Sequence, residues 1–271
     1  MLAQRIVTAI CLLAIFAGSL FAHWAVFAFL VVLVLLLSAW EWSQLADLQP
    51  TFSRVAYVVT LISAALLLVF FYLRLNFTVL YIAVAVVGGW FSLLPLLIRY
   101  PLSAPVFSSK PFTVALGALV LVSTALGLLW LHTQESGAWW VLLLICTVAV
   151  ADSGAYFSGR AFGKTPLAPK ISPSKTFEGV YGGLIANLVA AVLLCFILGF
   201  SIGDSVALVV MMTTTSLLSV EGDLLESVVK RSRGVKDSGQ ILPGHGGILD
   251  RVDGLCAATP IFILGFLLAG F

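Results

Sequence analysis

Nine apolar stretches follow one another along this 271-residue chain, and each is about as long as the ~20 residues that a helix needs to cross a bilayer. Charged residues make up only 10% of the chain, against about 25% in soluble domains, which excludes a water-soluble fold. The sequence therefore predicts an all-α polytopic membrane protein with a single integral-membrane domain over residues 1–271. The predicted helices cover residues 4–21, 23–42, 54–74, 77–98, 112–132, 138–158, 179–200, 204–228 and 253–271.

The distribution of basic residues predicts how these helices are oriented. With nine spans, Arg74 is the only one of the 14 lysines and arginines on the side opposite the N-terminus. Because basic loop residues collect in the cytoplasm, the N-terminus and two long polar segments, 159–178 and 229–252, are predicted to be cytoplasmic. Only a short turn near His23 separates the first two stretches, so a merged pair with eight spans is the alternative.

Both long polar segments lie in the second half of the chain, which predicts where the chemistry takes place. Residues 138–271 are expected to form the catalytic part, and residues 1–132 to supply N-terminal helices. A transporter would also explain many helices and buried acids. Its charges should gather near the membrane midplane, however, whereas these gather in loops.

Four acidic residues lie inside or at the ends of the apolar stretches, namely Asp152, Glu221, Asp223 and Glu226. A carboxylate at membrane depth costs about 3 kcal/mol or more unless it is paired, so such residues are functional candidates. Glu226 has an alternative as the ion-pair partner of Lys230, four positions further along the chain. Glu221 has an alternative as an interfacial acid. Asp152 and Asp223 are the stronger functional candidates because of the polar sequence around them.

Glycines, lysines and hydroxyl residues gather between Asp152 and Thr176. Glycines let a backbone approach phosphates, and lysines and hydroxyls supply charge and donors. The cytoplasmic bias of basic residues would explain the lysines but not the Ser-Pro-Ser-Lys-Thr order at 172–176. The pattern GxxxxGK[ST] of a P-loop is absent from the sequence. We therefore predict that Ser174 and Lys175 contact a phosphate.

The most informative segment covers residues 227–253 and reads SVVKRSRGVKDSGQILPGHGGILDRVD. It combines basic residues, which suit phosphates, with acids at a helix start, which suit a divalent cation. Phosphoryl or nucleotidyl transfer requires this combination, because the reaction depends on positioning and charge neutralisation. We call residues 227–253 the signature segment.

The signature segment resembles the signature of the phosphatidate cytidylyltransferases, also called CDP-diacylglycerol synthases. Every element of that pattern is present, at Ser227, Lys230, Arg231, Lys236, Asp237, Pro243, His245, Gly246, Gly247, Asp250, Arg251 and Asp253. The resemblance implies transfer of CMP from CTP to phosphatidic acid, giving CDP-diacylglycerol and pyrophosphate. It also implies a homodimer in the bacterial inner membrane, among membrane lipids, with its site facing the cytoplasm. Nucleic acid is not expected as a partner.

The resemblance assigns roles to individual residues. It implies Mg²⁺ held by Asp223 and Asp250, with Asp152 completing the site, and it leaves room for a second monovalent or divalent cation. The expected catalytic residues are Asp223, Asp250, Lys230, Arg231 and His245. The expected substrate-binding residues are Ser174, Lys175, Ser227, Lys236, Asp237, Gly246, Gly247 and Arg251. Asparagine in place of either Asp223 or Asp250 is expected to lower activity on the order of 10²-fold or more, with a weaker dependence on Mg²⁺ and without destabilising the fold.

Two alternatives remain at this point. His245 could protonate the leaving pyrophosphate, or it could be a turn residue between glycines. The CDP-alcohol phosphotransferases also combine membrane helices, Mg²⁺ and carboxylates. Their spaced pattern of Asp-Gly, Ala-Arg, Gly and two further Asp is not met, because Asp253-Gly254 alone matches it.

Overall fold

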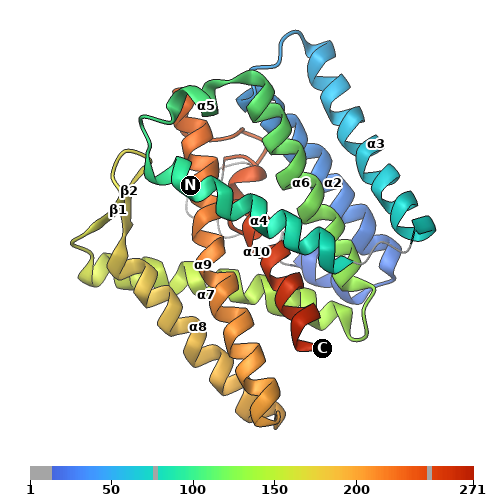
Figure 1. The fold of residues 1–271 in the computed structure, drawn as a ribbon, viewed down its shortest axis with the longest axis vertical. Helices are drawn as coiled ribbons and strands as arrows, with labels where there is room; N and C mark the ends of the chain where they lie inside the picture. Colours follow the sequence, from blue (N-terminus) through green and yellow to red (C-terminus); the bar gives the residue numbers. More distant parts are fainter. Residues whose placement is uncertain (1–13, 76–78, 243–245) are drawn as a thin grey trace. The chain divides into compact units, whose positions relative to one another are not determined.

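The computed structural model describes residues 14–75, 79–242 and 246–271, and this part of the chain is largely helical (Figure 1). Eight of the described helices are long and apolar enough to cross a membrane. They are α2 (Trp24–Leu45), α3 (Thr51–Leu75), α4 (Val79–Ile98), α6 (Lys110–His132), α7 (Gly137–Phe162), α8 (Phe177–Leu198), α9 (Ile202–Ser232) and α10 (Leu249–Ala269). The chain is therefore an integral membrane protein with many helical spans, as predicted.

These eight helices match the last eight predicted stretches within a few residues at each end. Of the first stretch, residues 14–21 are helical and the rest lies outside the described residues, so the count of nine spans stays a prediction. The helical turns of residues 14–21 end before α2, because the chain bends at Ala22 and His23. The His23 ring nitrogen Nδ1 accepts a hydrogen bond from the backbone N–H of Ala25 (3.3 Å) and so caps α2. The cytoplasmic orientation also stays a prediction.

Three short elements, one helix and two strands, are additions to the predicted all-α fold. Helix α5 (Ala104–Ser108) precedes α6, and the strands β1 (Pro166–Ala168) and β2 (Ser172–Thr176) pair antiparallel between α7 and α8 (Figure 1). Polar and proline residues fill this hairpin, so it lacks the alternation of apolar residues that marks a strand. Backbone pairing alone defines it, which explains why the sequence indicated a loop here.

The described chain divides into two compact units that interleave along the sequence. Unit 1 comprises Met1–Thr78, Ala104–Leu142 and Val228–Asp253, and unit 2 comprises Val79–Ser103, Leu143–Ser227 and Gly254–Phe271. The boundaries fall inside α7, α9 and α10, so each of these helices contributes to both units. Whether the whole chain forms a single membrane domain stays a prediction.

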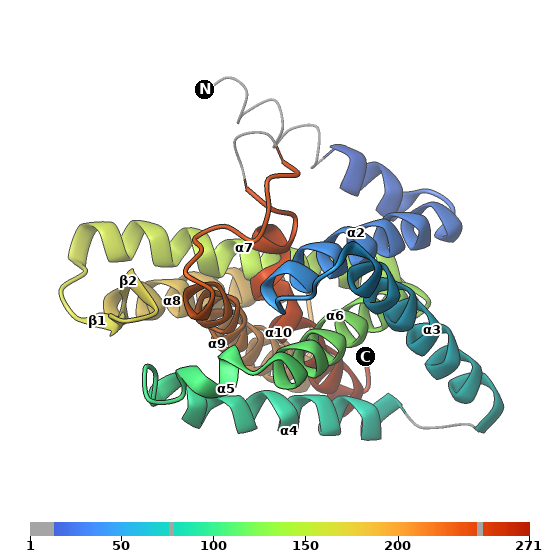
Figure 2. The same cartoon turned by 90° about the horizontal axis from the view of Figure 1, so that it is seen from above.

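In unit 1, α2, α3 and α6 pack against one another (Figures 1 and 2). The buried Trp42 joins α2 to α6, because its indole N–H donates to the carbonyl of Thr113 (2.8 Å). Gly117 of α6 faces the same indole, and any side chain there would collide with it. This contact fixes the C-terminal half of α2, which also carries Glu41.

In unit 2, α7 and α8 approach each other through small residues. A Cβ atom at Gly154 would lie 2.8 Å from that of Ala186, and one at Gly183 would lie 2.7 Å from the carbonyl oxygen of Ala151. Backbones come this close only where side chains are missing, as is common between membrane helices. Gly154 and Gly159 belong to the glycine-rich stretch between Asp152 and Thr176, and both serve helix packing here, because Gly159 likewise lies against Gly179.

Candidate active site

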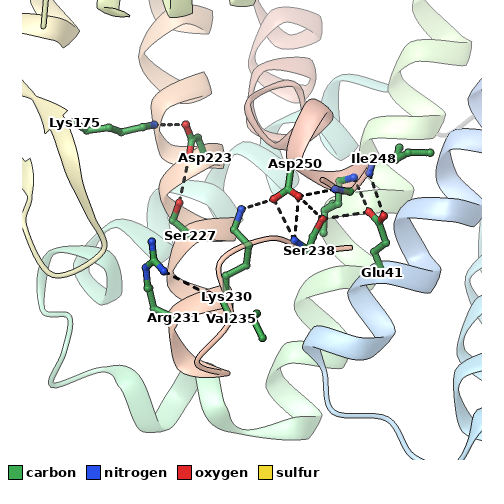
Figure 3. Close-up of polar contacts among 12 residues, drawn as sticks. Glu41, Lys175, Asp223, Ser227, Lys230, Arg231, Val235, Ser238, Ile248 and Asp250 are labelled. Atoms are coloured by element: carbon green, nitrogen blue, oxygen red, sulfur yellow. Dashed lines mark hydrogen bonds and ion pairs between the residues drawn. The ribbon is translucent and has the colours of Figure 1, made fainter. Parts of the chain in front are cut away.

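Four of the predicted site residues gather in unit 2, at the end of the β1–β2 hairpin. Lys175 of β2 reaches Asp223 of α9, with 2.5 Å between Nζ and Oδ2 (Figure 3). The Ser227 hydroxyl, one turn further along α9, donates to the other oxygen of Asp223 (3.3 Å). Asp152 of α7 lies within electrostatic range of both Lys175 and Asp223. The side chains of Lys175 and Asp223 are 26% and 34% exposed, so a ligand can reach them.

The sequence around the hairpin explains why Lys175 points toward α9. The Glu178 carboxylate accepts hydrogen bonds from the backbone N–H groups of Lys164 (3.1 Å) and Thr165, which closes the base of the hairpin. The Thr176 hydroxyl caps α8 by accepting from Gly179 N–H (3.1 Å). A capping hydroxyl followed by an acid in the first turn is a favourable helix start. Lys175 is therefore held one residue before a well-defined helix N-terminus.

A second polar cluster lies in unit 1 and centres on Asp250, in the first turn of α10. One carboxylate oxygen lies 2.5 Å from Lys230 Nζ, in the last turn of α9. The other accepts from the backbone N–H of Gly247 (2.9 Å) and from both the backbone N–H (3.0 Å) and the hydroxyl (2.9 Å) of Ser238 (Figure 3). The Lys230 and Asp250 side chains are only 11% and 10% exposed, so this is a nearly buried ion pair.

A second acid, Glu41 of α2, belongs to the same cluster although the sequence analysis did not identify it. Glu41 is fully buried. Its carboxylate accepts from the backbone N–H groups of Ile248 (3.1 Å) and Leu249 (2.8 Å). The Ser238 hydroxyl, whose single proton is shared with Asp250, lies 3.3 Å from the same carboxylate. Glu41 lies at the end of the apolar stretch 23–42, so the criterion that selected Asp152 and Asp223 would also have selected it.

Two glycines of the signature segment are required by this geometry. Gly246 has a φ of +82°, which L-residues rarely adopt, and a Cβ there would lie 3.0 Å from Asp250 Oδ2. Gly247 leaves no room for a side chain, because a Cβ would collide with the Ser238 hydroxyl and lie 2.6 Å from Glu41 Oε2. Both glycines therefore shape the loop around the two acids.

The remaining predicted residues with described side chains lie at the surface. The side chains of Arg231, Lys236, Asp237 and Arg251 in unit 1, and of Ser174 in unit 2, are exposed, as a soluble substrate requires. Arg231 also donates to the carbonyl of Val235 (3.5 Å), within the turn that ends α9. His245 lies outside the described residues. The long α9 places Lys230 and Arg231 on a helix, where the sequence indicated a loop.

The acids differ in how well they suit a divalent cation. Among the described residues, no three His, Cys, Asp or Glu side chains form a group that could hold a metal by themselves. Asp152 and Asp223 offer hard oxygen ligands within electrostatic range of each other, and Mg²⁺ commonly binds through one or two carboxylates plus substrate phosphates. Both oxygens of Asp250 already accept protein donors, so its binding to a cation requires that Lys230 leave Oδ1.

Comparison with known proteins gives one consistent result. A model described as the cytidylyltransferase family matches residues 3–268. A phosphatidate cytidylyltransferase of Pseudomonas aeruginosa is 44% identical over 265 residues, covering 97% of this chain and 96% of the relative. One of Haemophilus influenzae is 39% identical over 282 residues, covering 97% of each chain. One of Brucella suis is 34% identical, covering 97% of this chain and 92% of the relative. With a match over nearly its whole length, this chain belongs to the cytidylyltransferase family.

Proposed function

We propose that this protein is a phosphatidate cytidylyltransferase, which transfers CMP from CTP to phosphatidic acid. The observation that carries the proposal is the intact signature segment, in which Asp250 pairs with Lys230 and accepts hydrogen bonds from backbone N–H groups of the adjoining loop. Full-length relatives that carry this name, such as that of Pseudomonas aeruginosa, support it. The role in phospholipid biosynthesis follows from the product, CDP-diacylglycerol.

The proposed reaction needs no covalent enzyme intermediate and no strong base. The phosphate of phosphatidic acid is ionised at neutral pH, and one of its oxygens forms a new bond to the α-phosphorus of CTP. The bond from that phosphorus to the bridging oxygen breaks, and pyrophosphate leaves with the electron pair. The main obstacle is repulsion between two polyanions, so catalysis consists of positioning and charge neutralisation.

The chain supplies cations for this purpose in both clusters. In the proposed roles, Lys175 and Lys230 contact phosphates, each leaving the carboxylate that it pairs with in the structure. The exposed Arg231, Lys236 and Arg251 offset the remaining charge. Lys175 lies in β2, Lys230 and Arg231 in the last turn of α9, Lys236 in the loop between α9 and α10, and Arg251 in the first turn of α10, so the backbone carries each cation at a defined place.

We further propose that Asp152 and Asp223 hold Mg²⁺, with Ser227 orienting Asp223. When bound, Mg²⁺ would neutralise phosphate charge and ease departure of the pyrophosphate. The participation of Asp250, the second cation and the chemical role of His245 stay predictions. So do the homodimer and the position in the bacterial inner membrane with the site facing the cytoplasm.

One assay tests the proposed function. Purified full-length protein is incubated with phosphatidic acid, CTP labelled in the cytidine, and Mg²⁺, and lipid-soluble label is measured. We expect labelled CDP-diacylglycerol and an equal amount of pyrophosphate. Asp223→Asn protein prepared in the same way controls for contaminating enzymes. A wild-type preparation without a lipid-soluble cytidine product would refute the proposal and favour a transporter or another enzyme class.

A further inference from the structure

We propose that Glu41 of α2 is a positioning residue for the reaction, because it holds the loop between α9 and α10 in the geometry that orients Asp250 and Lys230. No direct contact of Glu41 with substrate is implied. This inference rests on the proposed function for its kinetic test, while its structural test is independent of turnover.

The burial of Glu41 indicates that its carboxylate has a specific structural role. It is fully buried near the end of a helix that is otherwise almost entirely apolar. A buried carboxylate is strongly unfavourable unless donors surround it. Here those donors are the N–H groups of Ile248 and Leu249 and the Ser238 hydroxyl. The first N–H groups of a helix have no partner within the helix, so Glu41 provides the acceptors that the start of α10 requires.

The contacts continue from Glu41 to the lysine of the signature segment. Leu249, whose N–H donates to Glu41, immediately precedes Asp250. The Ser238 hydroxyl lies 3.3 Å from Glu41 and 2.9 Å from Asp250, so it lies between the two acids. Asp250 in turn pairs with Lys230. A change at Glu41 can therefore affect Lys230 through Ser238 and Asp250, which lie between them.

A second contact holds the other end of the same loop to the same helix. The Arg233 side chain, in the first residue after α9, donates through Nε to the carbonyl of Leu45 at the end of α2 (2.7 Å). One helical turn of α2, from Glu41 to Leu45, thus contacts the loop at its beginning and at its end. Because Trp42 anchors this turn to α6, the loop is oriented by a fixed element.

The glycines of the loop are matched to the Glu41 carboxylate. A Cβ atom at Gly239 would collide with Glu41 Oε1, and one at Gly247 would lie 2.6 Å from Oε2. The two glycines are eight residues apart in sequence, and each lies against a different oxygen of the Glu41 carboxylate. The sequence of the loop is therefore adapted to an acid at position 41.

The test compares Glu41→Gln with the control Ser38→Ala in full-length protein. Glutamine keeps the shape of glutamate, but its NH₂ group is a donor and cannot accept a hydrogen bond. In either orientation of the amide, at least one of the donors from Ile248, Leu249 and Ser238 therefore loses its acceptor. Ser38 lies one turn earlier on α2, is also buried, and has a hydroxyl with no hydrogen-bond partner among the described residues. The control therefore removes a buried polar atom without affecting the loop.

We expect amide hydrogen exchange at Ile248 and Leu249 to become about tenfold faster or more in Glu41→Gln, as for lost hydrogen bonds to a charged acceptor. We expect kcat to fall about tenfold or more with small changes in KM, because misplacement of reacting groups affects the rate more than binding. In Ser38→Ala both quantities should stay at the wild-type values.

A double-mutant cycle with Ser238→Ala separates positioning from general stability. If Glu41 acts through the loop, the loss of kcat in the double variant should be clearly smaller than the product of the single losses. If Glu41→Gln does not fold, Gly239→Ala perturbs the same carboxylate from the loop side and should give the same exchange pattern. Unchanged exchange at Ile248 and Leu249, or multiplicative losses of kcat, would overturn the inference. A wild-type protein without activity would instead refute the proposed function and leave the exchange result standing.

Discussion

Replacing Asp250 by asparagine should destabilise the protein as well as inactivate it, which corrects the sequence-based expectation of an unharmed fold. That expectation assumed an unpaired acid, whose removal offers relief. In the structure Asp250 accepts from Lys230, Gly247 and Ser238. An asparagine NH₂ would oppose either the Lys230 ammonium or the donors of Gly247 and Ser238.

The magnitude follows from the burial of this pair. Breaking a buried ion pair by removing one partner costs about 3–5 kcal/mol, and the Lys230 and Asp250 side chains are only 11% and 10% exposed. We therefore expect Asp250→Asn to lower the free energy of unfolding by about 3 kcal/mol.

The assay is reversible denaturation by SDS in mixed micelles, with Asp223→Asn as the matched control. Asp223 also pairs with a lysine, but its side chain is 34% exposed, and exposed pairs contribute about 1 kcal/mol or less. An Asp250→Asn protein as stable as Asp223→Asn would refute the reasoning, because it would show that the donors around Asp250 do not depend on its charge.

Three further predictions concern the site in unit 2 and the orientation in the membrane. Asp223→Asn should remain folded, lose activity on the order of 10²-fold and depend less on Mg²⁺; near-normal turnover would remove Asp223 from the metal site. Lys175→Ala should raise the KM for CTP or phosphatidic acid, or lower kcat, at normal expression. Unchanged kinetics would show that Lys175 does not contact substrate and reflects only the preference of basic residues for cytoplasmic loops. Cysteines at the exposed positions Ser108 and Ser174 should be shielded from an impermeant reagent outside intact cells, whereas one at Ser136 should be labelled; the reverse pattern would overturn the predicted orientation.

The sequence predicted the helices well because hydropathy over about 20 residues is a strong and local signal. It predicted α9 less well at its end. The apolar pattern stops near residue 228, but the helix continues to Ser232. Lys230 and Arg231 lie in its last turn, where their positive charges interact favourably with the helix dipole. Basic residues in the last turn are typical of helix ends, so this extension could have been predicted.

The role of Glu41 was much harder to predict. Glu41 and Leu249 are 208 positions apart, and no local pattern connects them. The sequence also divided the chain into N-terminal helices (1–132) and a catalytic part (138–271), although α2 contributes directly to the cluster around Asp250. Spacing within a motif reports on neighbours along the helix or loop, whereas this contact depends on tertiary packing between α2 and the start of α10.

The close approach of α7 and α8 has a consequence for how remote changes affect the substrate. Since their backbones approach closely at Gly154, Gly182 and Gly183, few side chains between them can change rotamer and absorb a displacement. The hairpin that carries Lys175 joins the ends of this stiff pair, and Ser158 of α7 donates to the carbonyl of Glu178 in α8 (2.7 Å). A bulkier residue at Gly182, which lies directly against Ser158, would push the helices apart and move the ammonium group with them. Mechanical coupling of this kind would let a substitution between two apolar helices alter the affinity for a water-soluble nucleotide.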